Sequence, residues 1–216
     1  MPMEQLSEMR RRILLAALPN MVFDGWSPKA VQAGLRAEGL EPDKFETEFP
    51  GDMAELARFF STFGDQVMTE EMAKLDLEEL SFEERAGRAI RLRLEALAPH
   101  REAVRRLFAY LALRANAPLA AHNLTRTADA ICRAAGDQST DFTYYTRRTM
   151  VAAFQTGTVL YWLADETENM IDTVDFIQRR VSRLVGPGRM GPEIGHRLGL
   201  LPSPFRLFRL LSARTR

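Results

Sequence analysis

Apolar residues recur along this chain at the spacing of amphipathic helices, three or four positions apart. One such face is formed by Met53, Leu56, Phe60, Phe63 and Val67. A second consists of Val104, Leu107, Phe108 and Leu111. Sustained alternation of apolar and polar residues, which marks strands, is almost absent. The pattern predicts an all-α protein.

Cap residues, glycines and prolines divide the pattern into nine helices. Ser27-Pro28 is a helix cap followed by a first turn, and Ser81 with Glu84 is a capping box. Pro19 should kink or restart the first helix, because proline removes a backbone donor. The predicted helices span about residues 4–24, 28–39, 42–49, a long fourth helix that includes 53–67, 81–97, 99–111, 118–136, 141–164 and 169–185. A further terminal helix is expected at about residues 204–214.

The same signals give a domain organisation. Residues 1–50 form a helix-turn-helix-like part and residues 51–185 the main helical part. Residues 186–192 are rich in glycine and proline and form a linker. Residues 193–216 form a tail that ends in an amphipathic helix.

Charge is distributed unevenly although the formal net charge is zero. Between Glu38 and Glu84, fifteen acidic residues stand against Lys44, Arg58 and Lys74. Between Arg179 and Arg216, nine arginines stand against one glutamate. The acidic region would repel nucleic acid, whereas the basic end could meet anionic lipid.

The sequence offers little for catalysis. Its three histidines lack metal-ligand spacing, and no phosphate loop, nucleophile elbow or Cys-x-x-Cys pair is present. We therefore expect no enzyme, catalytic residue, metal or cofactor. The single Cys132 fits a reducing compartment, and no apolar run is long enough to cross a membrane. These features predict a cytoplasmic protein.

The most distinctive segment is residues 136–148, where one helix ends and another begins. Gly136 fits the end of the first helix, Ser139 or Thr140 the cap of the second, and Asp141 its first turn. A further five polar and aromatic residues exceed what a helix connection needs: Asp137, Gln138, Tyr144, Arg147 and Arg148. Composition alone leaves open a functional corner or a well-capped turn.

This segment is similar to the signature of the lipid-binding accessory proteins of ubiquinone biosynthesis. The similarity extends to residues 12–18, 25–27, 97–99 and 174–181, and covers roughly residues 10 to 185. The fold of these proteins resembles that of TetR-type repressors, but they bind isoprenoid lipid in place of DNA. The resemblance implies a TetR-like fold with a degenerate N-terminal helix-turn-helix.

The resemblance also implies an apolar cavity for an isoprenoid quinone intermediate or a phospholipid. The candidate lining residues are Phe108, Leu111, Phe142, Tyr145, Met150, Phe154, Gly157, Thr158 and Tyr161. From the sequence alone, Gly157 either permits close helix packing or leaves space for a ligand, because glycine weakens a helix interior.

In this family the signature corner contacts the demethoxyubiquinone hydroxylase, a di-iron membrane enzyme. Carried over, the partner interface comprises Asp129, Ile131, Cys132, Gly136, Asp137, Tyr144 and Arg147. Judged as a single residue, Cys132 fits a small buried apolar position better. We also expect a homodimer.

The tail carries the candidate membrane-binding residues Phe205, Arg206, Leu207, Phe208, Arg209 and Leu211. A short basic amphipathic helix behind a flexible linker is typical of a peripheral membrane anchor. We expect it to contact the anionic surface of the inner membrane. The alternative is a tail docked on its own protein or on a second subunit.

The competing function is a TetR-type regulator that senses a lipid. The third helix of such regulators enters the major groove, and their affinity depends on cations that neutralise phosphates. Here residues 42–49 hold one lysine among carboxylates, which argues against nucleic-acid binding. The sequence thus predicts a non-enzymatic protein that extracts a prenylated quinone intermediate and presents it to a hydroxylase.

Overall fold

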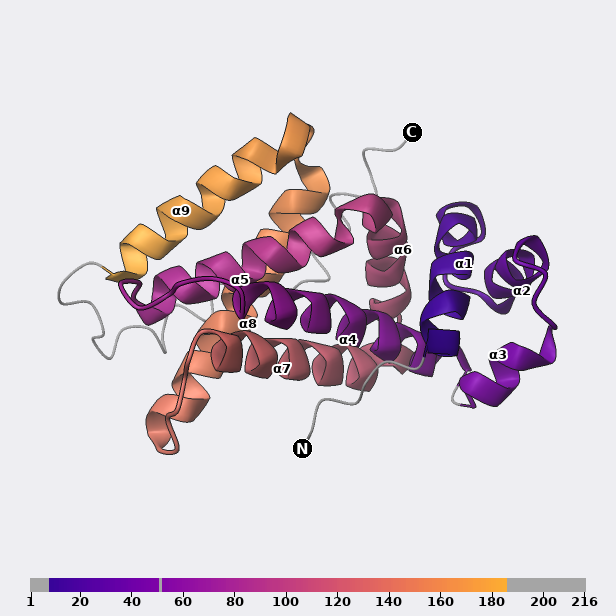
Figure 1. The fold of residues 1–216 in the computed structure, drawn as a ribbon, viewed down its shortest axis with the longest axis horizontal. Coiled ribbons are helices and arrows are strands. Elements are labelled where there is room, and N and C mark those ends of the chain that lie inside the picture. Colours follow the sequence, from indigo (N-terminus) through magenta and orange to yellow (C-terminus); the bar gives the residue numbers. More distant parts are fainter. Residues whose placement is uncertain (1–7, 51, 186–216) are drawn as a thin grey trace.

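The computed structural model describes residues 8–50 and 52–185, and over these residues it contains helices and no strand (Figure 1). The α-helices are α1 (Glu8–Asp24), α2 (Pro28–Ala37), α3 (Asp43–Glu48), α4 (Asp52–Met72), α5 (Phe82–Leu97), α6 (Arg101–Leu111), α7 (Ala117–Ala134), α8 (Phe142–Ala164) and α9 (Ile171–Val185). Short 3-10 turns, Ala98–His100, Arg114–Asn116 and Glu168–Met170, precede α6, α7 and α9. The prediction of an all-α protein is confirmed.

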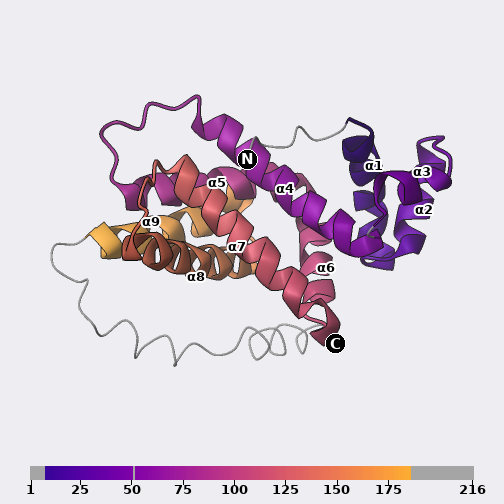
Figure 2. The same cartoon turned by 90° about the horizontal axis from the view of Figure 1, so that it is seen from below.

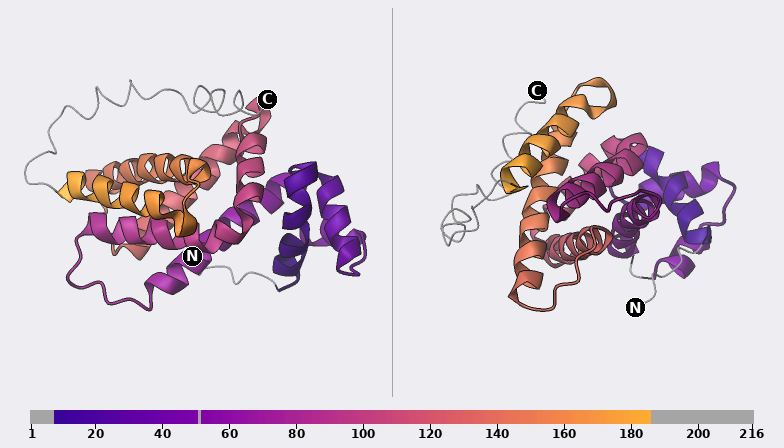
Figure 3. Two further views of the ribbon diagram at one scale, coloured as in Figure 1. Left: turned by 90° about the horizontal axis from the view of Figure 1, so that it is seen from above. Right: turned by 60° about the vertical axis from the view of Figure 1, so that its left-hand side comes forward.

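The helices form two groups that share α4. Helices α1, α2 and α3 lie together at one end, and α4 runs from them into the larger group (Figures 1 and 2). There α4 packs on α5 and α7, while α8 and α9 lie side by side and cover α5 (Figure 3). Helix α4 therefore connects the two groups through one continuous backbone.

The N-terminal group packs through a close helix crossing and a cluster of rings. A Cβ atom at Gly34 would overlap the backbone of Ala16, so only glycine lets α2 approach α1 this closely. Phe49 is fully buried, and the ring of Phe59 meets it edge-on with centroids 5.4 Å apart. The Arg10 guanidinium lies over the Phe49 ring at 4.5 Å. This ring cluster joins α1 and the segment after α3 to α4.

Local signals in the sequence account for most helix ends. The Ser27 hydroxyl accepts the Ala30 N–H, and both hydrogen bonds of the capping box between Ser81 and Glu84 are present. Gly136 adopts the left-handed conformation, with φ +82°. These predictions are confirmed.

Two local predictions need comment. Helix α1 continues through Pro19, which is exposed, so of the kink or restart expected there the restart does not occur. The predicted cap of α8 is wrong. Asp141 rather than Ser139 or Thr140 caps α8, because its carboxylate accepts the Thr143 N–H at 2.9 Å. Asp141 therefore precedes the first turn in which it was expected.

The predicted linker, 186–192, and tail, 193–216, lie outside the described residues. The six membrane-binding candidates fall in that region: Phe205, Arg206, Leu207, Phe208, Arg209 and Leu211. Within residues 8–50 and 52–185, no helix has the length and apolar character that crossing a bilayer requires.

Candidate functional site

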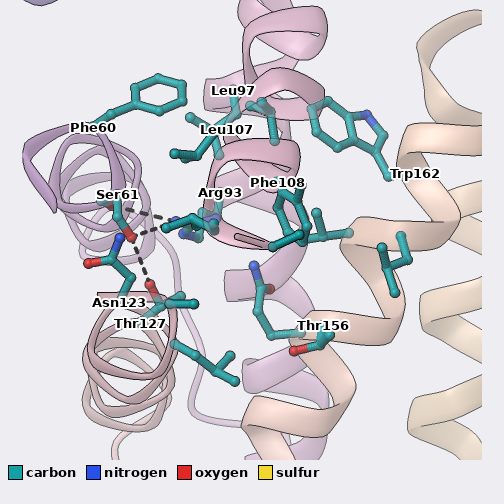
Figure 4. Close-up of a pocket in the computed structure, with 18 of the residues that line it drawn as sticks. Phe60, Ser61, Arg93, Leu97, Leu107, Phe108, Asn123, Thr127, Thr156 and Trp162 are labelled. Carbon is teal, nitrogen blue, oxygen red and sulfur yellow. Dashed lines mark hydrogen bonds between the residues drawn. The ribbon is translucent and has the colours of Figure 1, made fainter. Parts of the chain in front are cut away.

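A cavity of about 320 Å³ lies among α4, α5, α6, α7 and α8 (Figure 4). This volume is at the small end of the roughly 300–1,000 Å³ range of ligand pockets. Its wall is mostly apolar: Phe60, Leu94, Leu97, Val104, Leu107, Phe108, Leu111, Ala112, Ala117, Ala120, Ala121, Leu124, Val159, Leu160 and Trp162. Ser61, Arg93, Asn123, Thr127, Gln155 and Thr156 complete it.

One side of the cavity is open and is lined mainly by alanines. Ala117 and Ala121 are exposed, and Leu111, Ala112 and Ala120 are half-buried. These five residues, at the turn between α6 and α7, form what we call the mouth. Alanine side chains leave room there, so an extended apolar group can pass.

Another part of the wall is polar and deeply buried. Figure 4 shows Ser61, Arg93, Asn123 and Thr127 gathered on one side of the cavity. Arg93 donates through Nε to Asp65 at 2.7 Å, and both side chains of this ion pair are at least nine-tenths buried. Thr127 also donates to Asp65, at 3.0 Å. A buried ion pair needs such extra hydrogen bonds to offset the desolvation of its charges.

Two polar side chains in the cavity wall have atoms without a partner. Asn123 and Gln155 are 7% and 4% exposed. Among the described residues, neither Asn123 Nδ2 nor Gln155 Oε1 makes a hydrogen bond. Most buried polar atoms in folded proteins do have a partner, so these two are unusual.

Only two of the nine predicted lipid-contacting residues, Phe108 and Leu111, line this cavity. Phe142 and Tyr145 are 83% and 69% exposed at the first turn of α8. Tyr161 stacks on Phe176 of α9, with ring centroids 4.5 Å apart. These three aromatic side chains are outside the cavity wall.

The other four candidates lie on faces of α8 that point away from the cavity. Gln155, Thr156, Val159, Leu160 and Trp162 line it, whereas Met150, Phe154, Gly157 and Thr158 do not. Gly157 is exposed, and a Cβ added there would meet nothing within 4 Å. It therefore neither permits close packing within this chain nor leaves space for a ligand. Thr158 is fully buried, and its hydroxyl donates to the Phe154 carbonyl.

The polar cavity residues were not predicted from the sequence. Arg93, Asn123 and Gln155 occupy buried positions of otherwise amphipathic helices. An isolated polar residue on an apolar face is the signal that could have identified them.

The signature corner is an ion-pair cluster around Asp137, whose side chain is fully buried. Arg147, Arg148 and Ser139 donate to its carboxylate at 2.6, 2.8 and 2.8 Å. Burial opposes ionisation, but these hydrogen bonds outweigh it and lower the pKa of Asp137 to about 2. Asp137 thus remains ionised throughout the neutral range.

Arg148 extends the cluster to the end of α7. It also donates to Asp129 at 2.8 Å and lies over the Tyr144 ring at 3.4 Å. Arg147 lies over the Phe82 ring at 4.5 Å. The corner therefore fixes α7, α8 and the start of α5 relative to one another.

The predicted partner interface needs a correction. Ile131 and Cys132 are fully buried, so neither offers surface to a partner. Burial also raises the pKa of the Cys132 thiol to about 11. Gly136 is exposed, whereas Tyr144 and Arg147 are half-buried. Exposed apolar surface at this corner comes from Phe142 and Tyr145.

The structure shows no cluster of three or more His, Cys, Asp or Glu side chains suited to a metal ion within the part of the chain it describes. The described residues that line the cavity include no acidic, cysteine or histidine side chain. The arrangement can hold an apolar molecule that carries polar atoms at one end.

Comparisons with known proteins agree with the expected family. Residues 117–186 match the COQ9 family model. The chain is 31% identical over 198 residues to "Ubiquinone biosynthesis protein COQ9, mitochondrial" of Homo sapiens, covering 88% of this chain and 62% of the human protein. The protein of the same name from Drosophila melanogaster is 30% identical, with 84% and 56% covered. The chain thus spans less than two thirds of the length of these relatives.

A solved structure gives the fold. The TetR transcriptional regulator from Nitrosomonas europaea ATCC 19718 superposes with a TM-score of 0.67 at 20% identity, over 82% of this chain and 98% of the regulator. The prediction of a TetR-like fold is confirmed. At this identity the likeness concerns the fold alone.

Proposed function

Because this chain belongs to the COQ9 family of ubiquinone biosynthesis proteins, we propose that it is a non-enzymatic lipid-binding protein of that pathway. It takes a prenylated quinone intermediate from the membrane and presents it to a demethoxyubiquinone hydroxylase. The observation that carries the proposal is the largely apolar cavity of about 320 Å³.

The size and chemistry of the cavity suit part of such a lipid. An apolar cavity of about 150 Å³ can bind benzene, so this one accommodates a substituted ring and the first part of a tail. The rest of the tail leaves past Ala117 and Ala121 at the mouth. Transfer of the lipid from water into the cavity is favoured in proportion to the apolar area buried, at about 25 cal/mol per Å².

The composition of the wall supports binding rather than catalysis. General acid–base chemistry needs a titratable group within hydrogen-bond reach of the substrate. The cavity wall offers Arg93, which is paired with Asp65, along with amides and hydroxyls. We therefore assign the chemistry to the partner enzyme.

We propose that the hydroxylase docks at the signature corner. Phe142 and Tyr145 present exposed aromatic surface there, and Tyr144 with Arg147 lies beside them. Ile131, Cys132 and Asp137 support this surface from beneath. The basic tail would attach the protein to the anionic cytoplasmic face of the inner membrane.

We further propose a homodimer formed through the outer face of α8. Thr149, Ala153, Gly157 and Tyr161 are exposed there at four-residue intervals. The small residues among them would let a second α8 approach closely. Sedimentation of the full chain at the monomer mass at all concentrations would contradict this.

The regulator alternative has less support. Asp43 and Glu46 of α3 are exposed, while Phe45 is buried. These carboxylates would face the DNA phosphates, and a lone Lys44 cannot offset them. We propose that duplex DNA is not a partner. Salt-sensitive, sequence-specific retardation of a promoter fragment would instead favour the regulator.

Mass spectrometry of lipid extracted from mildly purified protein tests the proposal. Ala120→Trp should fill the cavity and remove most of the bound isoprenoid, because Ala120 lines the wall. Ala109→Trp is the matched control: it is the same substitution at an exposed alanine of α6 outside the cavity wall, and it should leave the lipid in place. Melting curves check that both variants fold. The proposal fails if no lipid is recovered from wild type, or if both variants retain equal amounts.

A further inference from the structure

The polar side of the cavity is incomplete as a hydrogen-bonded cluster. Arg93 and Thr127 both donate to Asp65, but Asn123 Nδ2 and Gln155 Oε1 lack a partner among the described residues. Both amides lie in the cavity wall and are more than nine-tenths buried. One unpartnered atom is a donor and the other an acceptor, so a ligand atom of the matching kind would complete each.

We propose that this polar side binds the oxygen-bearing ring of the lipid, so that the ligand enters ring first and its tail leaves through the mouth. The proposal rests on the proposed lipid-binding function and adds an orientation and two recognition residues to it. Asn123 donates its amide N–H to a ring oxygen, and the Gln155 carbonyl accepts from a ring hydroxyl.

Burial along the cavity supports this orientation. The polar residues Asn123, Thr127 and Gln155 are 4–7% exposed. At the mouth, Ala117 and Ala121 are exposed and carry no polar side-chain atom. A lipid placed tail first would put apolar carbons against unpartnered amides and its ring oxygens against alanines. With the ring at the polar side, the ring oxygens meet the amides and the apolar tail meets the alanines of the mouth.

The lack of net charge on the polar side favours a neutral ligand over an anionic one. The positive charge of Arg93 is matched by Asp65 at 2.7 Å, so the polar side has no net charge. A phosphate headgroup or a fatty-acid carboxylate would bring an unmatched negative charge into a buried apolar site, which is strongly unfavourable. A neutral ring that carries carbonyl, methoxy or hydroxyl oxygens brings acceptors and a donor without a charge.

In this orientation the ring is shielded while the tail reaches the surface. A tail that protrudes past Ala121 can remain in a bilayer while the ring is held by the protein. The ring is then released to the hydroxylase in a separate step from uptake.

The test compares two probes on the full-length protein: a ubiquinone with a two-isoprene tail, and farnesene, an isoprenoid hydrocarbon without oxygen. Trp162 lines the cavity, so quinone binding should quench its fluorescence, and farnesene is measured by displacement of the quinone. Asn123→Leu and Gln155→Leu should each weaken quinone binding about tenfold, which corresponds to about 1.4 kcal/mol. Farnesene binding should change less than about twofold.

Thr125→Val is the matched control, because Thr125 lies on α7 near Asn123 but is exposed outside the cavity wall, and its hydroxyl donates to the Ala121 carbonyl of its own helix. This variant should bind both probes as wild type does. The Tm of the lipid-free protein gives a second readout. Because Asn123 Nδ2 and Gln155 Oε1 have no partner among the described residues, the leucine variants should not lower Tm.

Each outcome decides a separate point. Unchanged quinone affinity in Asn123→Leu and Gln155→Leu overturns ring-first binding but leaves lipid binding intact. Equal weakening of quinone and farnesene also overturns it, since the residues would then only shape the cavity. If either leucine variant unfolds, Gln155→Met with the same probes provides the comparison. Failure of wild type to bind either probe overturns the proposed function itself.

Discussion

Two groups of buried polar side chains among the described residues, one at the signature corner and one in the cavity, differ in whether their hydrogen bonds are complete. The corner cluster comprises Asp129, Asp137, Ser139, Arg147 and Arg148, and both oxygens of its central Asp137 carboxylate accept hydrogen bonds. The cavity cluster comprises Ser61, Asp65, Arg93 and Thr127 together with the amides of Asn123 and Gln155 in the same cavity wall. One atom of each amide has no partner among the described residues.

The difference separates a structural role from a binding role. A complete cluster offers nothing to a ligand, but it holds three helices in place. An incomplete cluster costs stability in the free protein and gains its missing bonds on binding. The distinctive segment 136–148 thus forms the rigid corner. Arg93, Asn123 and Gln155, which belong to no sequence motif, line the cavity.

The largest effect we expect is from removing the centre of the corner cluster. Asp137→Ala should lower the free energy of unfolding by about 3–5 kcal/mol, because it leaves two partly buried guanidinium groups without their shared partner. Urea denaturation followed by circular dichroism measures the loss. Gln138→Ala, an exposed neighbour, should change it by less than about 0.5 kcal/mol. Equal effects of the two changes would remove the contrast between the clusters.

Acid should weaken the corner cluster in a defined pH range. The pKa of Asp137 is about 2 in the folded chain against an ordinary 3.8, so its stabilisation is complete above about pH 4 and is lost as the pH falls toward 2. Asp165 behaves alike: burial opposes its ionisation, but hydrogen bonds from Thr167 and Thr173 outweigh it and lower its pKa to about 2.

Urea midpoints measured from pH 6 to pH 2 test this. The wild-type unfolding free energy should fall between about pH 4 and pH 2, and Asp137→Asn should fall less steeply because that carboxylate no longer titrates. Parallel curves for the two proteins would mean that the corner does not depend on the charge of Asp137.

The smallest effect concerns α8, which contributes to both clusters but carries Gly157 outside them. Gly157→Ala should raise the free energy of unfolding by up to about 1 kcal/mol, since alanine favours a helix and the added Cβ meets open space. Lipid content and quinone affinity should not change. Because Gly157 lies on the face proposed for the dimer, the added Cβ should also weaken self-association in sedimentation. Unchanged self-association would contradict that interface.

Helices were predictable because their signals are local. The Ser81 and Glu84 pair fixed the start of α5, and Gly136 marked the end of α7, each from a few neighbouring residues. The choice of Ser139 or Thr140 as a cap was wrong because Ser139 instead bonds to Asp137 across the loop. That contact depends on the loop conformation, which the sequence does not reveal.

The site was predictable only in part. Phe108 and Leu111 of α6 were correctly placed on an inward face, because that helix has one clear apolar side. Helix α8 carries apolar or small residues on several faces, so its pattern did not tell Gln155 and Val159 from Phe154 and Thr158. Packing against α7 and α9 determines which face of α8 points into the cavity. Likewise, Arg93 and Asn123 come to line one cavity only after α5 and α7 have packed on α4.

Because Cys132 is buried beneath the corner, the rate at which its thiol can be labelled reports local opening of this part of the protein. Cys132 is the single cysteine of the chain, it is fully buried, and its thiol pKa is raised to about 11, so it stays protonated and shielded in the closed state. A thiol reagent can therefore react only as fast as the end of α7 separates from its neighbours. The labelling rate, followed with and without lipid or partner, reports how often the corner opens and whether ligand binding slows that motion.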